Sequence, residues 1–252
     1  MLLQNGGLVK TKEFRSPKYI GDPINAVRIF NEKKADELFV VDINATVDGE
    51  RPDYDLIKKI SSECRMPFCY GGGIKTVDDA VALVEFGVEK ISISSAAISN
   101  PKLISSLASE IGSQSVAVTI DVITKRSLLG ERYFVSSHNG QKIHDVDIFD
   151  FLSKCQDLGA GEIIINSVTD DGNMSGYNLT LAGKVKDQLQ VPFTLLGGAG
   201  NLNDLKNLIR RCGPIGACAG SLFVFKGRYR AVLINYPQHE EKIAMSKIWP
   251  EL

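Results

Sequence analysis

The stretch from Pro67 to Ala80 reads PFCYGGGIKTVDDA, and the stretch from Pro192 to Leu205 reads PFTLLGGAGNLNDL. Each begins with a proline and a short apolar run, reaches paired glycines, and continues into a segment typical of a helix start. Pro67 and Pro192 are 125 positions apart in a chain of 252 residues, so the pattern recurs after half the length. A half-length repeat predicts two structurally equivalent halves.

The rest of the chain alternates short apolar runs with helical patterns, which is typical of parallel strands joined by helical crossovers. We expect strands at 38–43, 68–70, 90–93, 115–121, 162–166, 193–196 and 217–219, with a poorly bounded first strand running from 2–3 towards 8–9. Helices are expected near 53–64, 101–110, 147–158, 179–189, 203–211 and 228–235, with further starts at Asp22-Pro23 and Thr76.

About eight strand–helix units in this length predict an α/β fold, a closed (β/α)8 TIM barrel built from two half-barrels of four units each. The alternative is a doubly wound open sheet. We expect one domain over residues 1–252. The polar residues 125–144, with a Tyr-Phe-Val core, are interpreted as a short hairpin inserted after the fifth strand.

Composition argues against several classes of protein. A net charge of −1 and a pI of about 6.3 give no global basic surface for nucleic acid or a membrane. The five cysteines and three histidines show no metal-ligand spacing, which indicates reduced thiols and no metal site. There is no signal-peptide pattern and no long apolar run. We therefore expect a cytoplasmic protein without a cofactor.

In a barrel of this type, the loops that follow the strands form the active face. Glycine turns let a phosphate oxygen approach backbone N–H groups, while serines and helix N-termini supply further donors. The repeat therefore predicts two phosphate cradles and one small ligand with a phosphate at each end. The alternative is that the glycines only relieve crowding between strand and helix. The first cradle comprises Gly73, Ser94 and Ser95, and the second comprises Gly197, Gly198, Gly220 and Ser221.

Other candidates are charged or polar residues at expected strand ends. Asp121 ends the apolar run VAVTID, which favours a general acid or base over a carboxylate that only binds loop amides. Asp42, Asn166 and Asp171 could orient substrate hydroxyls or fasten loops. Lys10, just after the first strand, could neutralise a phosphate or lie in solvent.

The opposite rim of the expected barrel carries its own charges. Glu37, Lys90 and Glu162 stand at the starts of even-numbered strands. These side chains could pair in a ring that closes the barrel bottom. Taken alone, ordinary solvated strand ends are the simpler interpretation.

Together these motifs resemble the HisF family, the cyclase subunits of imidazole glycerol phosphate synthase. The resemblance runs almost end to end and is carried by GDPINAVRIFNEKKADELFVVDI, GGGIKTVDDA, ISISSAA, GSQSVAVTIDV, GAGEIIINSVTDDGNMSGYNLTL and LGGAGNLNDL. It implies a (β/α)8 barrel that forms a heterodimer with a glutaminase, HisH, docked on the barrel bottom. Ammonia from that partner would cross the barrel and cleave a phosphoribulosyl-formimino-carboxamide ribotide into imidazole glycerol phosphate and an aminoimidazole carboxamide ribotide.

The resemblance also implies roles for individual residues. Asp121 matches the catalytic acid of the fifth strand. Glu37, Lys90 and Glu162 match three of the four charges that gate ammonia entry, which favours the ring over solvated strand ends. Phosphate-binding positions are matched by Lys10, Gly73, Ser94, Ser95, Gly198, Gly220 and Ser221.

Several residues depart from the family pattern. Leu2 stands where the family has its second catalytic aspartate, and the neighbouring Gln4 and Asn5 cannot titrate. The sequence begins after the position of the fourth gate residue, an arginine, which we expect to be absent. Further departures are Asn166 for a threonine, Leu196 for a serine and Thr169-Asp170 for an acid–arginine pair.

These departures resemble a branch of second HisF paralogues linked to surface-polysaccharide genes. That resemblance implies an ammonia-conducting subunit serving a sugar amidotransferase that makes acetamidino groups. Because Leu2 removes half of the acid–base pair, we expect weak or no cyclase activity with the histidine-pathway ribotide. A sugar-phosphate isomerase of related barrel type is a third alternative, but it too would lack its first-strand aspartate here, and it would not need the bottom charges.

Overall fold

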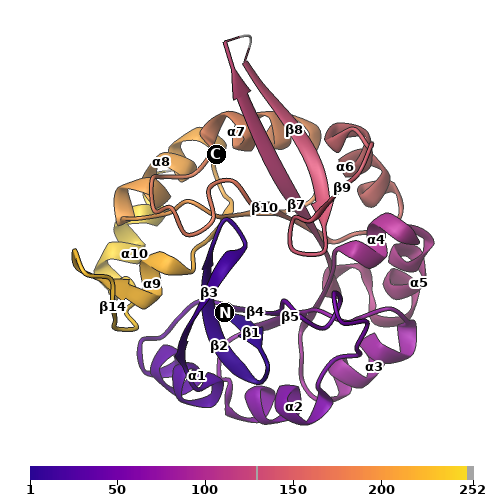
Figure 1. Ribbon diagram of the computed structural model, residues 1–252, viewed down its shortest axis with the longest axis horizontal. Coiled ribbons are helices and arrows are strands. Elements are labelled where there is room, and N and C mark those ends of the chain that lie inside the picture. Colours follow the sequence, from indigo (N-terminus) through magenta and orange to yellow (C-terminus); the bar gives the residue numbers. More distant parts are fainter. Residues whose placement is uncertain (129, 249–252) are drawn as a thin grey trace.

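The computed structural model describes residues 1–128 and 130–248 of the chain. Within this part, eight parallel strands form one sheet in the order β12-β11-β10-β7-β6-β5-β4-β1. Figure 1, a view down the barrel axis, shows these strands inside a ring of helices, the arrangement of a (β/α)8 barrel. The strands are β1 (Leu2–Gln4), β4 (Leu38–Asp42), β5 (Phe68–Gly71), β6 (Lys90–Ile93), β7 (Val116–Ser127), β10 (Glu162–Ser167), β11 (Phe193–Leu196) and β12 (Gly216–Cys218).

Helices follow the strands and cover the outside of the sheet. Their burial patterns place apolar residues against the strands and polar residues towards solvent, as for amphipathic helices of a globular domain. They are α1 (Pro23–Glu32), α2 (Tyr54–Glu63), α3 (Val77–Glu85), α4 (Ser95–Ser99), α5 (Lys102–Ile111), α6 (Ile148–Asp157), α7 (Leu179–Gln188), α8 (Leu202–Cys212), α9 (Ser221–Val224) and α10 (His239–Ser246).

The two repeated stretches fold in the same way. Each strand, β5 or β11, is followed by a glycine turn and a helix that begins with a capping box. In the first, Thr76 Oγ1 accepts from the Asp79 N–H at 3.1 Å while Asp79 Oδ2 accepts from the Thr76 N–H at 2.9 Å. Asn201 and Asp204, 125 positions later, make the equivalent pair. In both halves of the repeat, therefore, the helix that follows the strand begins with the same capping box.

Apolar residues fill both faces of the sheet. A large buried cluster lies between strands and helices and includes Phe68 and Tyr70 of β5. The alternate residue Cys69 belongs to a separate small cluster with Ala117 and Ile164, against which Phe39 packs. Because side chains alternate across a strand, this small cluster fills the barrel interior.

The first strand differs from the expected continuous segment. β1 turns at Asn5 and Gly6, whose φ angles are 51° and 74°, and β2 (Gly7–Lys12) returns antiparallel to it. β3 (Arg15–Gly21) then pairs antiparallel with β2. The expectation of one strand running through residues 2–9 was therefore wrong, because Asn-Gly is a strong signal for a two-residue hairpin. Lys10 consequently lies on β2 rather than in a loop after the first strand.

The hydrogen-bonded ring has a seam. Among the described residues β1 pairs with β4 and β2, and no pairing joins β1 to β12. A cavity of about 450 Å³ lies here and is lined by Met1, Phe39, Cys218 and Gly220, among others. The buried Met1 amino group donates to the Phe39 carbonyl, and burial lowers its pKa to about 5. β2 pairs with the edge of β1 opposite β4, so the backbone ladder of the described residues has no β1–β12 pairing, although the eight strands follow the order of a (β/α)8 barrel.

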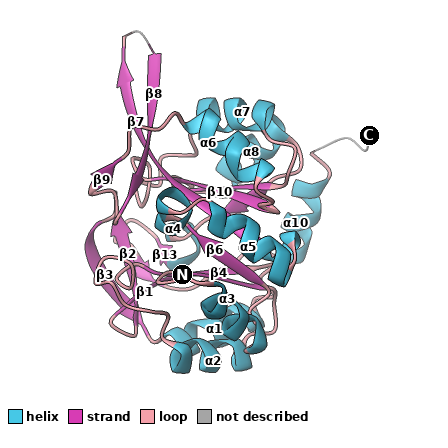
Figure 2. Cartoon of the chain, turned by 90° about the vertical axis from the view of Figure 1, so that its right-hand side faces the viewer, coloured by secondary structure: helices cyan, strands magenta, loops and turns pink. Residues whose placement is uncertain are grey.

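The fifth barrel strand extends into a long antiparallel arm. β7 continues to Ser127 and pairs with β8 (Gly130–Ser137), which in turn pairs with β9 (Lys142–Ile143). Figures 1 and 2 show this arm projecting beyond the helices. The antiparallel pairing begins opposite Asp121, which also pairs with Asn166 of β10. Asp121 therefore lies within a strand, where parallel and antiparallel pairing meet, rather than at a strand end.

The helix expected near 228–235 is also wrong. The structure has a short hairpin there, formed by β13 (Phe225–Lys226) and β14 (Ala231–Val232). Gly227 and Arg230 have φ angles of 72° and 49°, which turn the chain back instead of continuing a helix. The helix after this hairpin is α10, which begins at His239.

Candidate active site

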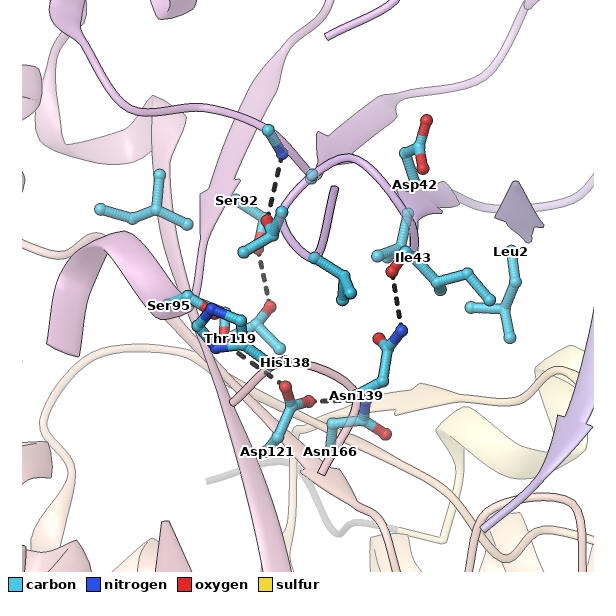
Figure 3. Close-up of a pocket in the computed structure, with 18 of the residues that line it drawn as sticks. Leu2, Asp42, Ile43, Ser92, Ser95, Thr119, Asp121, His138, Asn139 and Asn166 are labelled. Carbon is cyan, nitrogen blue, oxygen red and sulfur yellow. Dashed lines mark hydrogen bonds between the residues drawn. The ribbon is translucent and has the colours of Figure 1, made fainter. Parts of the chain in front are cut away.

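A pocket of about 110 Å³ opens at the carboxyl ends of the barrel strands, the face that carries active sites in this fold. Figure 3 shows side chains from several strands and from the arm converging on it. Of the sequence-based candidates, it is lined by Asp42, Gly73, Ser94, Ser95, Asp121 and Asn166, and also by Leu2.

Asp121 is the acid–base candidate of this pocket. Its Oδ1 accepts from Asn166 Nδ2 at 3.0 Å, and its Oδ2 accepts from Ser94 Oγ at 3.5 Å. Loss of water around the carboxyl raises the pKa of Asp121 to about 7, although the two hydrogen bonds act in the opposite direction. A carboxyl with this pKa exchanges a proton near neutral pH, which suits general acid–base chemistry.

Leu2 brings an apolar side chain to the pocket where the sequence resemblance places a carboxylate. Asp42 lines the same pocket, but its Oδ1 accepts from the backbone N–H groups of Asn44 at 2.9 Å and Ala45 at 3.1 Å. Asp42 therefore fastens the loop after β4. Gln4 Nε2 donates to Asn44 Oδ1 at 3.0 Å, so it too supports this loop rather than replacing the missing acid.

The first glycine turn is set close to the strand end. A Cβ at Gly72 would lie 2.5 Å from the Asp42 carbonyl oxygen, and a Cβ at Gly73 would lie 3.0 Å from the Glu50 carbonyl oxygen. Ser94 precedes α4 without a side-chain capping bond, and Ser95 begins this helix. Gly73 and the two serines thus line the same pocket, where a glycine turn and hydroxyls are residue types that suit an anion site.

Gly220, which follows β12, has a buried lysine beside it. A Cβ at Gly220 would lie 2.4 Å from Lys10 Nζ, so the absence of a side chain at Gly220 makes room for this lysine. Burial lowers the pKa of Lys10, and attraction to Asp171 opposes that effect. Ser221 Oγ is buried and has no hydrogen-bond partner among the described residues. A cation and an unpaired hydroxyl are therefore available to an oxyanion here.

The remaining candidates of the second cradle do not line the 110 Å³ pocket. Lys10 and Gly220 line the larger cavity at the seam, whereas Gly197, Gly198, Asp171 and Ser221 line neither. Asp171 Oδ2 accepts from Thr11 Oγ1 at 2.7 Å, and the Gly198 carbonyl accepts from the Gly176 N–H at 2.8 Å. Asp171 thus fastens its loop to β2.

Three charges gather at the opposite end of the barrel. Lys90 Nζ lies 3.0 Å from Glu37 Oε1 and 2.7 Å from Glu162 Oε2. Thr194 Oγ1 donates to the other Glu162 oxygen at 2.6 Å. Burial alone would lower the pKa of Lys90, but the hydrogen bonds and attraction from the two glutamates raise it well above its usual value. The three residues therefore form one ion cluster rather than separate solvated strand ends.

Sequence patterns missed several polar residues that the structure places in the pocket, among them Thr11, His138 and Asn139. Thr11 comes from β2, and His138 and Asn139 come from the turn between β8 and β9. The signal for the latter pair is the run SSHNG inside the inserted hairpin, because Asn-Gly marks a tight turn. What the run does not show is that this turn folds back over the barrel mouth.

Other site types find little support in the described part of the chain. There, no group of three His, Cys, Asp or Glu side chains could hold a metal ion. The five cysteines are free thiols. No described helix is long and apolar enough to cross a membrane.

Comparison with known proteins identifies the family. Residues 1–230 match the family model described as histidine biosynthesis protein. A Leptospira borgpetersenii protein with the provisional name imidazole glycerol phosphate synthase subunit HisF is 54% identical over 97% of this chain and 96% of its own. A Pseudomonas aeruginosa protein, with the provisional name subunit hisF2, is 44% identical over 94% and 93%. Imidazole glycerol phosphate synthase subunit HisF of Petrotoga mobilis is 35% identical over 91% and 89%. The chain therefore belongs to the histidine biosynthesis protein family, and within it to the HisF proteins.

Proposed function

We propose that this chain is a HisF-type synthase subunit, a lyase that uses ammonia to cleave a ribotide with two phosphates. The products are imidazole glycerol phosphate and an aminoimidazole carboxamide ribotide. The observation that carries the proposal is the pocket around Asp121, whose raised pKa suits a group that exchanges protons near pH 7. The names of the HisF relatives, which run nearly the full length of the chain, support it.

The substrate's phosphates would bind at the two glycine turns. One phosphate accepts from the N–H of Gly73 and from Ser94 and Ser95. The other meets Gly198, Gly220 and Ser221, with Lys10 as its counter-charge. The unpaired hydroxyl of Ser221 and the close approach of Lys10 to Gly220 support the second cradle. Anchoring both ends of one ligand would hold the reacting centre near Asp121.

Ammonia would enter at the ion cluster of Glu37, Lys90 and Glu162. A glutaminase of HisH type docked over this cluster would form a heterodimer with the barrel and supply ammonia sheltered from water. The interior above the cluster is lined by Phe39, Cys69 and Ile164. Such an apolar interior favours passage of neutral ammonia over ammonium, because a charged group is costly to desolvate.

Leu2 favours a second candidate function. An apolar residue at this position of the pocket removes one carboxylate of the acid–base pair implied by the family resemblance. A paralogue that conducts ammonia to a sugar amidotransferase, for acetamidino sugars of surface polysaccharides, would not need that carboxylate. On this alternative, the barrel keeps its ion cluster and has little cyclase activity.

The two functions are separated by turnover with ammonium chloride and the ribotide. If the chain is a lyase, purified protein forms both products, and Asp121→Asn lowers kcat by about 10²–10⁴-fold, the usual contribution of a general acid or base. Asp187→Asn, a change of an exposed aspartate on α7, serves as the matched control and leaves kcat unchanged. Absence of turnover in the unmodified protein would contradict the lyase and favour the conduit.

A further inference from the structure

The turn between β8 and β9 is held across the mouth of the pocket. His138, Asn139 and Gly140 have φ angles of 53°, 57° and 74°, and left-handed backbone at two successive residues other than glycine is uncommon. Asn139 Nδ2 donates to the carbonyl of Ile43 at 2.8 Å, which fixes the turn to the loop after β4. Such strain persists only where surrounding contacts hold it, and it is common at functional sites.

This turn brings an imidazole to the pocket. His138 lines the pocket together with Asp121 and Leu2, and Figure 3 labels all three among the side chains around it. The titratable residues of this lining are His138, Asp121 of β7 and Asp42 of β4. Since Asp42 is engaged by backbone N–H groups, His138 is the side chain left to carry a second proton.

A buried hydroxyl connects this imidazole to another one. Ser137 Oγ lies 2.9 Å from His138 Nδ1 and 2.8 Å from His144 Nε2. A hydroxyl has one proton, so when it donates to one ring it accepts from the other. Reversal of both hydrogen bonds would exchange the tautomers of the two rings. His138 Nε2 has no hydrogen-bond partner within the described part of the chain, which leaves it available to a ligand.

Of the three hydrogen-bonded residues His138, Ser137 and His144, His144 lies farthest from the pocket lining. It is partly exposed and can exchange protons with water. Burial lowers the pKa of His144, and electrostatic repulsion from the neighbouring Lys142 and His138 side chains adds to the effect. Compared with a free imidazole, the His144 ring therefore favours its neutral form, so it passes a proton to Ser137 rather than holding it.

We propose that His138 is the second proton-transfer group of this site, that it acts where Leu2 leaves no carboxylate, and that Ser137 and His144 connect it to solvent. The inference rests on the proposed lyase function. In the reaction, the nitrogen of ammonia replaces the ribulosyl carbonyl oxygen, which leaves as water, and then adds to the formimino carbon to close the ring. Besides the two protons in the water, this releases one proton to the departing nitrogen on addition and one to the Asp121 carboxylate. The departing nitrogen of the ribotide leaves with the electron pair of the broken C–N bond and takes a proton from His138 Nε2. His138 recovers a proton through Ser137 and His144, and Asp121 returns one to water, so no net charge accumulates.

Kinetics with ammonium chloride test this role. His138→Gln lowers kcat by about 10²-fold, the lower end of a general acid's contribution, with KM within about twofold. Added imidazole partly restores kcat of His138→Ala but has no effect on Asp121→Asn. His239→Gln, a change of an exposed histidine at the start of α10, is the matched control and keeps full activity. Full kcat in His138→Gln would overturn the inference.

The connecting hydroxyl is tested by two variants of one residue. Ser137→Ala removes the link and lowers kcat by about 10-fold, because the imidazole remains but recovers its proton more slowly. Ser137→Thr keeps the hydroxyl and keeps most of kcat. A loss of kcat in Ser137→Thr equal to that in Ser137→Ala, or no loss in either, would contradict the connection.

Histidine ring NMR separates failure of this inference from failure of the proposed function. No turnover in the unmodified protein contradicts the lyase function alone. In the spectra, Ser137→Ala shifts the ring signals of His138 and His144 and leaves His239 unchanged, and glycerol phosphate shifts the signal of His138. The charged groups near the two histidines also influence these ring signals. They are Lys142 on the arm and Asp42 and Asp121 on the barrel. Unchanged His138 signals in both experiments would overturn the inference whatever the turnover.

Discussion

At the scale of single residues, the raised pKa of Asp121 links the chemistry of the site to stability. The folded protein favours the protonated carboxyl, since the pKa is about 7 in the fold against an ordinary value of 3.8. The stabilising contribution of the protonated form is therefore fully present below about pH 4 and is lost as the pH rises to 7 and beyond.

This linkage predicts a pH-dependent gain for Asp121→Asn. The neutral amide avoids the cost of a desolvated charge, so its stability relative to the unmodified protein should rise between pH 4 and pH 8. The rise is on the order of 4 kcal/mol, at about 1.4 kcal/mol for each unit of pKa shift. Urea unfolding at several pH values measures it, with Asp187→Asn as the control. A constant difference between the two proteins over that range would show that the Asp121 carboxyl titrates normally.

Residue types alone indicated only part of the pocket. Asp121, Ser94 and Gly73 could be chosen because an acid or a glycine turn at a strand end has few structural uses. His138 could not, because its place depends on how the β8–β9 turn folds back over the barrel. The same holds for Leu2, whose significance comes from a resemblance and not from its own chemistry.

At the scale of elements, the capping boxes of α3 and α8 are equivalent in position, but their aspartates accept different numbers of hydrogen bonds. Asp79 is 1% exposed and accepts from the backbone at Lys75 and Thr76, from Arg51 and from the Tyr54 hydroxyl. Burial alone would raise the pKa of Asp79, but these donors outweigh it and lower the pKa well below its usual value. Within the described part of the chain, Asp204 accepts from the backbone at Gly200 and Asn201 alone.

This difference predicts that the same substitution, aspartate to asparagine, lowers the free energy of unfolding by different amounts in the two capping boxes. Asp79→Asn should lower the free energy of unfolding by about 3 kcal/mol, because several charge-assisted hydrogen bonds are weakened and buried donors lose their partner. Asp204→Asn should cost about 1 kcal/mol, as for a single helix cap. The Asp79 contribution is present above pH 4 and is lost as the pH falls, since its folded pKa is lowered. Urea unfolding of both variants at pH 7 measures the two losses of unfolding free energy. Equal losses would contradict the hydrogen bonds assigned to Asp79.

Most barrel strands could be predicted because they are buried on both faces, and a strand of this kind is a short apolar run that stands out in the local sequence. β6 and β11 have the expected bounds, and each is a short apolar run between a helix and a polar or glycine turn. The β1–β2 hairpin and the β13–β14 hairpin were missed because their apolar residues also fit a strand or a helix. These segments form hairpins because each strand pairs antiparallel with the next one along the chain. Whether such a hairpin forms depends on the residues of its turn.

At the scale of the whole molecule, two groups of charged residues lie at opposite ends of the barrel. One end carries the ion cluster of Lys90 with Glu37 and Glu162, and the other carries the pocket of Asp121. The half-length repeat predicted the paired glycine turns of the second end. It could not predict the seam between β1 and β12, since the edge of β1 opposite β4 is taken by β2 of the hairpin, and the repeat does not contain that hairpin.

The central claim is that the two repeated turns form a pair of anion sites on one ligand-binding face. A crystal structure grown with inorganic phosphate tests it most directly. We predict one phosphate at Gly73, Ser94 and Ser95, and a second at Gly198, Gly220 and Ser221 within reach of Lys10. Phosphate absent from both turns at saturating concentration would contradict the account.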